Sequence, residues 1–236
     1  MTTVKSQERF KTAKGVFDDF TDRNLFELQS RDVFGELVSP LKVGKESNVF
    51  IAKKGKEKII VKIYRLQNCD FNRMYDYIRK DTRYEYLKKH KRDIIFAWTQ
   101  REYKNLLKAD KAGVTVPKPL AWKFNILVEE MIGDEEPALP LKDTHPKNPR
   151  EFLELIIREM KKMYKAGLIH GDLSAFNILN YDEKPVIIDF SQATLVKTPN
   201  SEELLERDVK NIIQFFRKLG VRVEAEDILV RIRDNS

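Results

Sequence analysis

Two short apolar segments that lie close together in the chain, each ending in polar residues, constrain the fold more than any other feature of the sequence. The first leads into HGDLSAFNIL (residues 170–179), and the second is VII (186–188), which is followed directly by Asp189. Short apolar runs bounded by turn residues are typical of buried strands. We therefore expect Asp172, Asn177 and Asp189 to meet in one place.

These three side chains match the requirements of phosphoryl transfer. One carboxylate must accept the proton of the attacking hydroxyl, while a second carboxylate and an amide oxygen hold magnesium against the nucleotide phosphates. Asp172 is the expected proton acceptor, and Asn177 and Asp189 are the expected metal ligands. Alone, each residue has a simpler explanation, as a turn cap, a left-handed loop residue or a strand end. The combined spacing favours the shared site.

A β-rich segment from Leu37 to about Tyr64 precedes this region. Its alternating stretches NVFIA and IIVKIY are separated by a charged turn at residues 53–58. The turn before NVFIA could cradle phosphates with backbone amides and a serine hydroxyl. It is not a Walker A loop, because Glu46 stands where Ser or Thr is required. The expected phosphate-loop residues are Gly44, Lys45, Glu46, Ser47, Asn48 and Val49.

Lys62 in IIVKIY and Glu102 in QREYKNLL (100–107) form a second candidate pair. A strand lysine that reaches the phosphates and a helix glutamate that pairs with it are typical of protein kinases. The alternative is a lysine on an ordinary strand surface. We expect the helix that carries Glu102 to begin near Ile95 and to stop at Gly113, with an extended connection at Pro117 and Pro119.

Together, HGDLSAFNIL, the following IDFSQA and the loop GKESNVF resemble the RIO family of atypical protein kinases, most closely its RIO1 branch. The resemblance implies an α+β, two-lobed protein-kinase-like fold that binds ATP with Mg2+, or with Mn2+. It implies a helical extension (1–36), a β-rich N-lobe (37–130) with a flexible insertion at about 66–97, and a hinge with a mostly helical C-lobe (131–236). Backbone groups of Glu130, Met131 and Ile132 would then meet the adenine.

Departures from ordinary protein kinases leave the phosphate acceptor open. Gly171 replaces the arginine that docks a phosphorylated activation loop, and no Ala-Pro-Glu segment follows Asp189. The resemblance implies either self-phosphorylation on Ser or Thr or transfer to Asp189 itself, which would make the chain an ATP-driven switch. It also implies a role in small ribosomal subunit maturation, with pre-ribosomal RNA as partner. By the same resemblance, Asp208 braces the loop of Asp172, unless it is an exposed helix residue, and His170 supports that loop.

Three alternatives remain at this point. Aminoglycoside and choline kinases share the HGD string but continue HGDLHxxN, whereas Ser174 stands at the histidine position here. A largely non-catalytic assembly factor could use the same fold as a binding module. Proteins of the RIO2 branch begin with a winged-helix domain of about 90 residues, whereas only about 36 residues precede the first strand expected here, which favours RIO1. The short C-terminal tail and the absence of eukaryote-like extensions favour a minimal, archaeal-type form.

Composition sets the remaining limits. The chain has 236 residues, of which 42% are hydrophobic, enough for a sizeable core. It has no apolar run of membrane-spanning length and no secretory signal, so we expect a cytoplasmic protein without a membrane partner. Its single cysteine, Cys69, excludes an internal disulfide, and no second histidine stands at zinc-ligand spacing. The net charge of +7 fits a polyanionic partner or ordinary solvated helix faces.

The helical segments are read from apolar periodicity. Phe10, Ala13 and Phe17 predict one short helix, and Thr21 is expected to cap a second. Residues 66–97 show weak periodicity and are interpreted as mobile or partly helical. Residues 150–166 predict an amphipathic helix ended by Gly167, and one last long helix is expected to follow IDFSQA.

Overall fold

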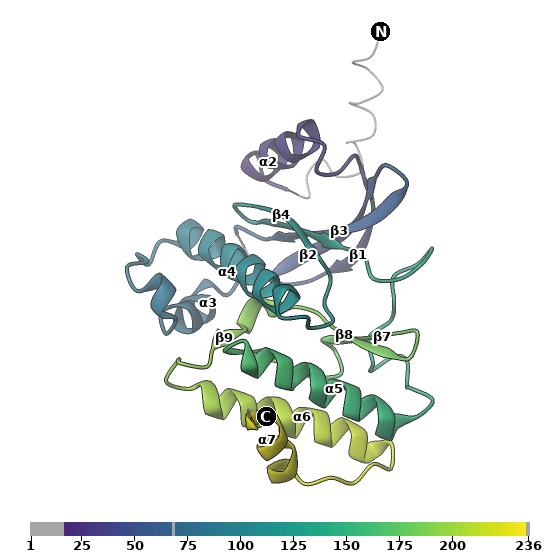
Figure 1. Ribbon diagram of the computed structural model, residues 1–236. Coiled ribbons are helices and arrows are strands. Elements are labelled where there is room, and N and C mark those ends of the chain that lie inside the picture. The colour runs from purple at the N-terminus through teal and green to yellow at the C-terminus, as the bar shows by residue number, and fades with distance from the viewer. Residues whose placement is uncertain (1–16, 68, 235–236) are drawn as a thin grey trace.

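The structure, a computed structural model, describes residues 17–67 and 69–234. A five-stranded antiparallel sheet lies above a group of helices (Figure 1). The strand order is β1-β2-β3-β5-β4. The bounds are β1 Leu37–Val43, β2 Ser47–Lys54, β3 Glu57–Tyr64, β4 Pro119–Lys123 and β5 Ile126–Glu130. The first expected N-terminal helix falls mainly on residues 1–16, outside the described part of the chain.

The register of the sheet gives its two faces different contacts. Residues that pair across antiparallel strands point to the same face. Val61 pairs with Phe50, and both pack in a core cluster against helix α2 (Asp19–Ser30). Lys62 pairs with Val49, so these two side chains lie on the opposite face, away from α2.

The sequence pattern suggested Thr21 as the cap of helix α2, but the residue that caps this helix is Asp18. The Asp18 carboxylate accepts hydrogen bonds from the backbone N–H groups of Phe20 and Thr21, both at 3.1 Å. Thr21 lies in the first turn and donates its hydroxyl to the same carboxylate at 3.0 Å. A carboxylate is the stronger acceptor at a helix N-terminus, because it also opposes the helix dipole.

The insertion after β3 forms helix α3 (Phe71–Ile78) and a short 3-10 turn (Thr82–Tyr84) before helix α4 (Lys91–Lys111). The expectation of partial helicity is therefore confirmed. Met74 and Ile78 of α3 pack in one buried cluster with Ile94 and Trp98 of α4. This packing also explains why α4 begins at Lys91, earlier than the expected Ile95: its first turn contributes to a core that the weak periodicity did not reveal.

The expected extended connection at Pro117 and Pro119 contains an edge strand, β4. Pro119 is its first residue, and the pairing with β5 shifts register between Pro119 and Ala121. Proline lacks the N–H that a central strand needs, so it is tolerated at the start of an edge strand. The two prolines concealed the strand in the sequence pattern.

The lower part of the molecule is built mainly from three helices, with short strand pairs facing the sheet (Figure 1). The expected amphipathic helix is α5, and Gly167 follows it at a φ of 70°. Beyond α6 the chain forms a further helix, α7, which was not predicted although its buried residues Ile228, Leu229 and Ile232 follow helical spacing. The helices are α5 Pro149–Lys165, α6 Ser201–Lys218 and α7 Ala225–Arg233.

Four short strands and one 3-10 turn complete this part. They are β6 Leu168–Ile169, β7 Ile178–Tyr181, β8 Lys184–Ile187, β9 Thr194–Leu195 and the turn η3 Phe190–Gln192. β7 and β8 form a hairpin, while β6 pairs with β9. None of the helices in the described part of the chain is long and apolar enough to cross a membrane.

Candidate active site

Asp172 lies in the loop between β6 and β7, and this loop is fixed from below by helix α6. The buried carboxylate of Asp208 accepts hydrogen bonds from the N–H groups of Gly171 at 2.7 Å and Leu173 at 2.8 Å. Asp208 is only 1% exposed, so the bracing role is the one that the geometry supports. Burial raises the pKa of Asp208 to about 7, although both N–H groups favour its charged form.

The local structure explains why residue 171 is a glycine. Its φ is 75°, in the left-handed region, and a Cβ at this position would lie 3.0 Å from the carbonyl oxygen of Gln192. A side chain here would therefore force the Asp172 loop and the segment after Asp189 apart. The glycine that distinguishes this chain from ordinary kinases allows these two segments to pack closely.

Asn177 is held against the same loop. Its Nδ2 donates to the backbone carbonyl of Asp172 at 2.9 Å. Because the amide nitrogen is engaged in this way, the amide oxygen is the atom left for a cation. Nearby, the His170 ring contacts the carbonyl of Ile188 at 3.0 Å, which ties the Asp172 loop to the residue before Asp189.

Lys62 lies between two carboxylates that come from different parts of the fold. Its ammonium group is 2.7 Å from Glu102 Oε1 on α4 and 3.0 Å from Asp189 Oδ1. Burial opposes the charged form of Lys62, but the attraction of Asp189 and Glu102 outweighs it and raises the pKa of the lysine. The strand lysine and the helix glutamate expected from the sequence are therefore paired.

Asp189 is more accessible than the lysine that contacts it. Its backbone is left-handed, with a φ of 64°, and its side chain is 39% exposed. Burial opposes ionisation, but Lys62 holds the pKa of Asp189 well below its usual value. The structure thus presents an ionised, partly exposed carboxylate next to a cation.

Gln192 and Tyr64 are site residues that we did not predict. Gln192 Nε2 donates to Asp172 Oδ2 at 3.0 Å, so the segment after Asp189 also orients the expected base. Tyr64 donates its hydroxyl to Glu102. The base that Gln192 contacts is itself perturbed: burial raises the pKa of Asp172, and the negative charge of Asp189 adds to the effect. The glutamine was visible in IDFSQA, but only the fold shows what it contacts.

The expected phosphate loop is the turn between β1 and β2. Gly44 donates its N–H to the carbonyl of Ser47 at 3.0 Å, and a Cβ at Gly44 would approach that oxygen to 2.9 Å. The carbonyl of Glu46 accepts from the N–H of Arg65 at 2.9 Å, which anchors the turn to the end of β3. Lys45 lies between these two fixed residues.

Within this loop the side chains divide between the two faces of the sheet. Ser47 and Val49 pair with Tyr64 and Lys62, so they lie on the face that carries the lysine. Asn48 is buried and pairs with Ile63, which packs in the core on the α2 side. The Asn48 side chain therefore points away from the face that carries Lys62, and its backbone lies between β1 and β3.

The expected adenine-binding residues follow β5. Met131 packs in an apolar cluster with Ile51, Ile60 and Val49 on the face that carries Lys62. Such a cluster can cover one side of a flat base. The Ile132 carbonyl already accepts a hydrogen bond from the N–H of Ala138 at 2.8 Å.

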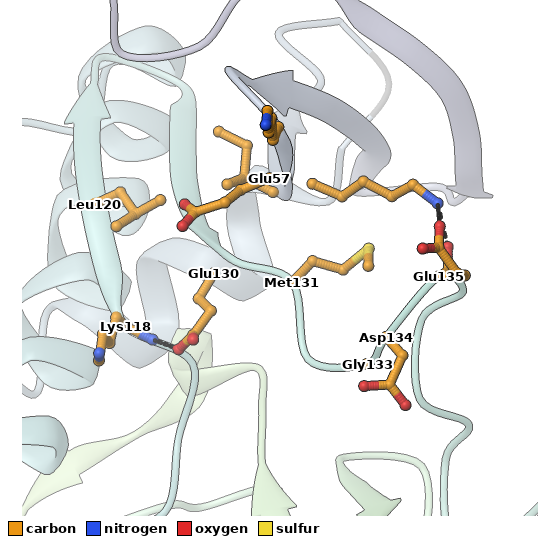
Figure 2. A pocket seen from close by; sticks show the side chains of 11 residues that line it. Glu57, Lys118, Leu120, Glu130, Met131, Gly133, Asp134 and Glu135 are labelled. Carbon is orange, nitrogen blue, oxygen red and sulfur yellow. Dashed lines mark hydrogen bonds and ion pairs between the residues drawn. The ribbon is translucent and has the colours of Figure 1, made fainter.

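The side chain of Glu130 does not take part in that apolar cluster. Its carboxylate accepts from the backbone N–H of Lys118 at 3.1 Å. Glu130 and Met131 also line a pocket of about 400 Å³ between the start of β3, β4 and the loop after β5 (Figure 2). The Glu130 side chain thus contributes to this pocket and to the contact with Lys118.

Glu129 was not predicted as a site residue. It pairs with Ile60, and the register therefore places it on the same face of the sheet as Lys62. Burial raises its pKa to about 8, and the negative charges of Glu102 and Asp189 contribute. Glu129 therefore belongs to the same group of interacting charges as Lys62, Glu102 and Asp189. The strand sequence ILVEE does not alternate, so no local pattern points to Glu129.

The donor atoms at this site suit magnesium. Asn177 and Asp189 offer an amide oxygen and carboxylate oxygens, the hard ligands that magnesium prefers. Within the described residues there is no group of three or more His, Cys, Asp or Glu side chains that could hold a metal ion. Magnesium at nucleotide sites usually has one or two carboxylate ligands together with phosphates and water, so the small donor set fits.

Comparisons with known proteins agree with this geometry. The family model described as the RIO domain matches residues 48–228. The RIO-type serine/threonine-protein kinase Rio1 of Methanocaldococcus jannaschii is 40% identical over 226 residues, covering 95% of this chain and 78% of the relative. The protein of the same name from Haloferax volcanii is 37% identical over 227 residues, with the same 95% and 78% coverage.

Solved structures of the Rio2 kinase from Chaetomium thermophilum share the fold. The one described as an ADP/Mg2+-phosphoaspartate complex superposes with a TM-score of 0.68 at 25% identity. It is matched over 89% of this chain and 66% of that chain. The expected α+β, kinase-like fold is therefore confirmed, and the small-molecule kinase alternative loses its support. The chain belongs to the RIO family, in its Rio1 branch, and is an ATP-dependent phosphotransferase.

Proposed function

We propose that this chain binds ATP with magnesium in the cleft beneath the sheet and transfers the γ-phosphate, with Asp172 as proton acceptor. The observation that carries the proposal is the position of Lys62, 2.7 Å from Glu102 and 3.0 Å from Asp189. A single cation thereby joins the sheet, helix α4 and the segment that follows β8. Phosphoryl transfer depends mainly on such positioning and charge neutralisation.

Lys62 has a direct role in this proposal. Glu102 is the more deeply buried of its two partners, with a side chain 2% exposed against 39% for Asp189. An arriving triphosphate would therefore replace Asp189 at the ammonium group, while Glu102 keeps the lysine in place. The freed Asp189 carboxylate, with Asn177, would then serve as a magnesium ligand. Bound magnesium would neutralise phosphate charge.

Asp172 is suited to take up a proton. It is half-buried, and its pKa is raised by burial and by the neighbouring Asp189. A raised pKa brings a general base closer to neutral pH, where proton transfer is most efficient. Gln192 and Asn177 hold its carboxylate and backbone, so the base is oriented before substrate arrives.

We further propose Asp189 as the first phosphate acceptor. Only residues 190–200 separate it from helix α6, which leaves little chain to hold a peptide substrate. The carboxylate oxygen would form a bond to the γ-phosphorus while the bond to the β–γ bridging oxygen breaks and ADP leaves. Water would then attack the aspartyl-phosphate, with Asp172 taking its proton. The phosphoaspartate of the C. thermophilum Rio2 structure supports this acceptor.

A role in maturation of the small ribosomal subunit follows from the family resemblance. The net charge of +7 suits a partner rich in RNA phosphate. A short-lived aspartyl-phosphate would suit an ATP-driven binding and release cycle better than repeated phosphorylation of a peptide. Self-phosphorylation on Ser or Thr is the competing outcome.

The test is incubation with γ-labelled ATP and Mg2+, followed by hydroxylamine treatment of the labelled protein. We expect label that hydroxylamine removes, no such label in Asp189→Ala, and loss of ATP turnover in Asp172→Ala. Asp143→Asn, an exposed change outside the site, should behave as wild type. Label that resists hydroxylamine and persists in Asp189→Ala would contradict the aspartyl-phosphate.

A further inference from the structure

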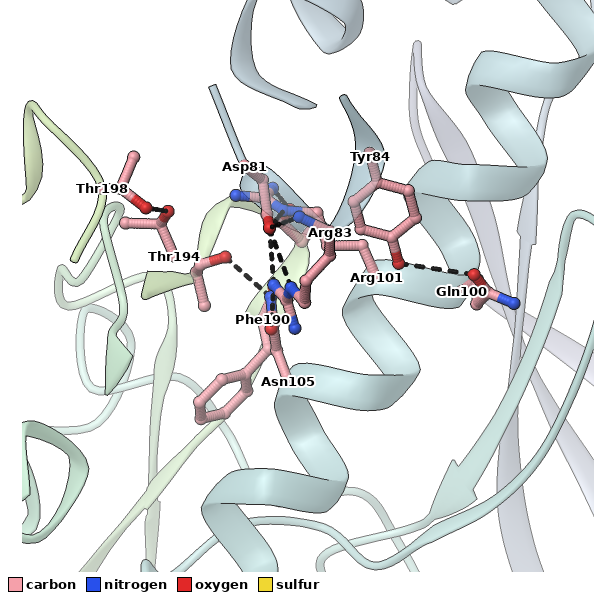
Figure 3. A network of polar contacts seen from close by, with 11 residues as sticks. Asp81, Arg83, Tyr84, Gln100, Arg101, Asn105, Phe190, Thr194 and Thr198 are labelled. Carbon is pink, nitrogen blue, oxygen red and sulfur yellow. Dashed lines mark hydrogen bonds and ion pairs between the residues drawn. The ribbon is translucent and has the colours of Figure 1, made fainter. Parts of the chain in front are cut away.

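A buried polar cluster joins the insertion after β3 to the segment directly after Asp189 (Figure 3). At its centre is Asp81, which is only 1% exposed and precedes the 3-10 turn of the insertion. Arg101 and Asn105 of α4 belong to the same cluster and are 1% and 0% exposed. Charged groups are rarely buried this completely unless they are paired, so we expect each charged group of the cluster to have a defined partner.

One branch of the cluster runs through Arg101. Its Nε donates to Asp81 Oδ2 at 3.0 Å, and its Nη1 donates to the backbone carbonyl of Ser191 at 2.8 Å. The guanidinium group is planar and rigid, so fixing one edge on a carboxylate fixes the direction of the other donors. Asp81 thus determines where Arg101 holds Ser191.

A second branch runs through Arg83. Its Nε and Nη2 donate to the two oxygens of Asp81 at 2.9 and 2.6 Å, and Nη2 also donates to Asn105 Oδ1 at 2.9 Å. Asn105 Nδ2 in turn donates to the carbonyls of Phe190 at 3.3 Å and Ala193 at 2.7 Å. Both branches therefore begin at Asp81 and end on the backbone of residues 190–193.

This backbone segment positions two carboxylates of the site. Asp189 immediately precedes it, with the left-handed φ of 64°. Gln192 lies within it and donates to Asp172 Oδ2 at 3.0 Å. A displacement of residues 190–193 would therefore move the expected metal ligand and the expected base together.

We propose that Asp81 is a positioning residue, which acts through Arg101 and Asn105 to hold residues 190–193 and so to align Asp189 with Asp172. The insertion is then part of the catalytic framework. A test by the Mg2+ dependence of ATP turnover rests on the proposed function, whereas a test by hydrogen exchange of the backbone does not.

The test compares Asp81→Asn with wild type in two measurements. Hydrogen exchange of the nucleotide-free protein should become about tenfold faster at the amides of residues 189–193, because the segment opens more often. The Mg2+ concentration for half-maximal ATP turnover should rise several-fold, and more than the KM for ATP. Asp76→Asn, which changes an exposed ion pair with Arg79 in the same insertion, is the matched control and should change neither.

Arg83→Gln guards against the chance that Asp81→Asn does not fold. It keeps the buried Asp81–Arg101 pair and removes only the branch through a partly exposed arginine. We expect the same two changes, each about threefold. A folded variant in which residues 189–193 exchange as in Asp76→Asn overturns the proposal. Absence of magnesium-dependent turnover in the wild type would instead refute the proposed function and leave the exchange result decisive for Asp81.

Discussion

Two loops of the site are each fixed by one buried aspartate, but through different chemistry. Asp208 binds two neutral backbone N–H groups of the Asp172 loop. Asp81 binds two guanidinium groups. Arg101 contacts the segment after Asp189 directly, and Arg83 reaches it through Asn105. Each carboxylate is 1% exposed, yet burial raises the pKa of Asp208 to about 7. At Asp81, burial is outweighed by hydrogen bonds from Arg83 and Arg101, and the pKa is lowered.

The difference teaches how partner charge determines the response of a buried acid. Neutral donors hold the Asp208 carboxylate in place without compensating the cost of burying its charge. Cations compensate that cost at Asp81 but must themselves remain paired. The stability contributed by the Asp172 loop should therefore fall at high pH. The stability contributed by the insertion should fall when Asp81 or one of its arginine partners is removed.

Asp81→Ala should have the largest effect on stability. It leaves Arg101 buried without its carboxylate, and breaking a buried pair in this way costs about 3–5 kcal/mol. Urea unfolding would measure the loss. A cost below about 1 kcal/mol, the range of an exposed pair, would show that the pair is not buried as described.

Asp208→Ala should cost somewhat less, about 2–4 kcal/mol, because two buried N–H groups lose an acceptor but no opposite charge is left behind. Asp208→Asn retains one acceptor oxygen and should lie between Ala and wild type. Urea unfolding at pH 6 provides the values. Equal costs for Asn and Ala would contradict the two-donor bracing of Gly171 and Leu173.

The pH dependence of Asp208 sharpens the comparison. Its folded pKa of about 7 exceeds that of an unfolded aspartate, so the folded state binds more protons and loses stability as pH rises from about 4 to 7. From pH 5 to pH 8, wild type should lose about 1–3 kcal/mol relative to Asp208→Asn. A parallel pH profile for the two proteins would contradict the raised pKa.

Asp81 should show the opposite sign. Its folded pKa is lowered, so its ionised form adds stability above the pKa of an unfolded aspartate, near 4. That stability is lost as pH falls through the lower, folded pKa. Asp81→Asn should therefore differ most from wild type at neutral pH and approach it in acid, as chemical unfolding from pH 7 down to pH 2.5 would show. A difference that grows on acidification would contradict the sign.

Glu206→Gln provides the smallest expected effect. It removes an exposed pair with Lys210 on helix α6, which also carries Asp208. Exposed pairs one helical turn apart contribute about 0.3–0.5 kcal/mol, and salt screens them. A loss above about 1 kcal/mol in urea unfolding would show that position on α6, and not burial, determines the cost.

The sequence predicted the parts of this molecule that local patterns specify. The periodicity of residues 150–166 predicted α5, and the alternating stretches NVFIA and IIVKIY predicted β2 and β3. The spacing of Asp172 and Asn177 predicted that these two residues meet, and they are joined by a hydrogen bond. Asp18 as the cap of α2 and β4 behind its prolines were missed, because several residue types compete at such positions.

The contacts of Asp81 and Gln192 were also missed, for a different reason. Arg101 meets Ser191 across 90 positions of sequence, and Gln192 meets Asp172 across 20. Partners at such separations are determined by how the helices and loops pack, so no local pattern identifies them. The same holds for Glu129, whose proximity to Lys62 follows from the pairing of β5 with β3.

Calorimetric titration with a non-hydrolysable ATP analogue tests the shared site most directly. We expect wild type to bind it more tightly with Mg2+ than without, and Asp189→Ala to lose most of that difference while still binding through Lys62. Lys62→Ala should weaken binding under both conditions. Equal affinity of wild type with and without Mg2+, or an unchanged Mg2+ effect in Asp189→Ala, would contradict a nucleotide site built on Lys62, Asn177 and Asp189.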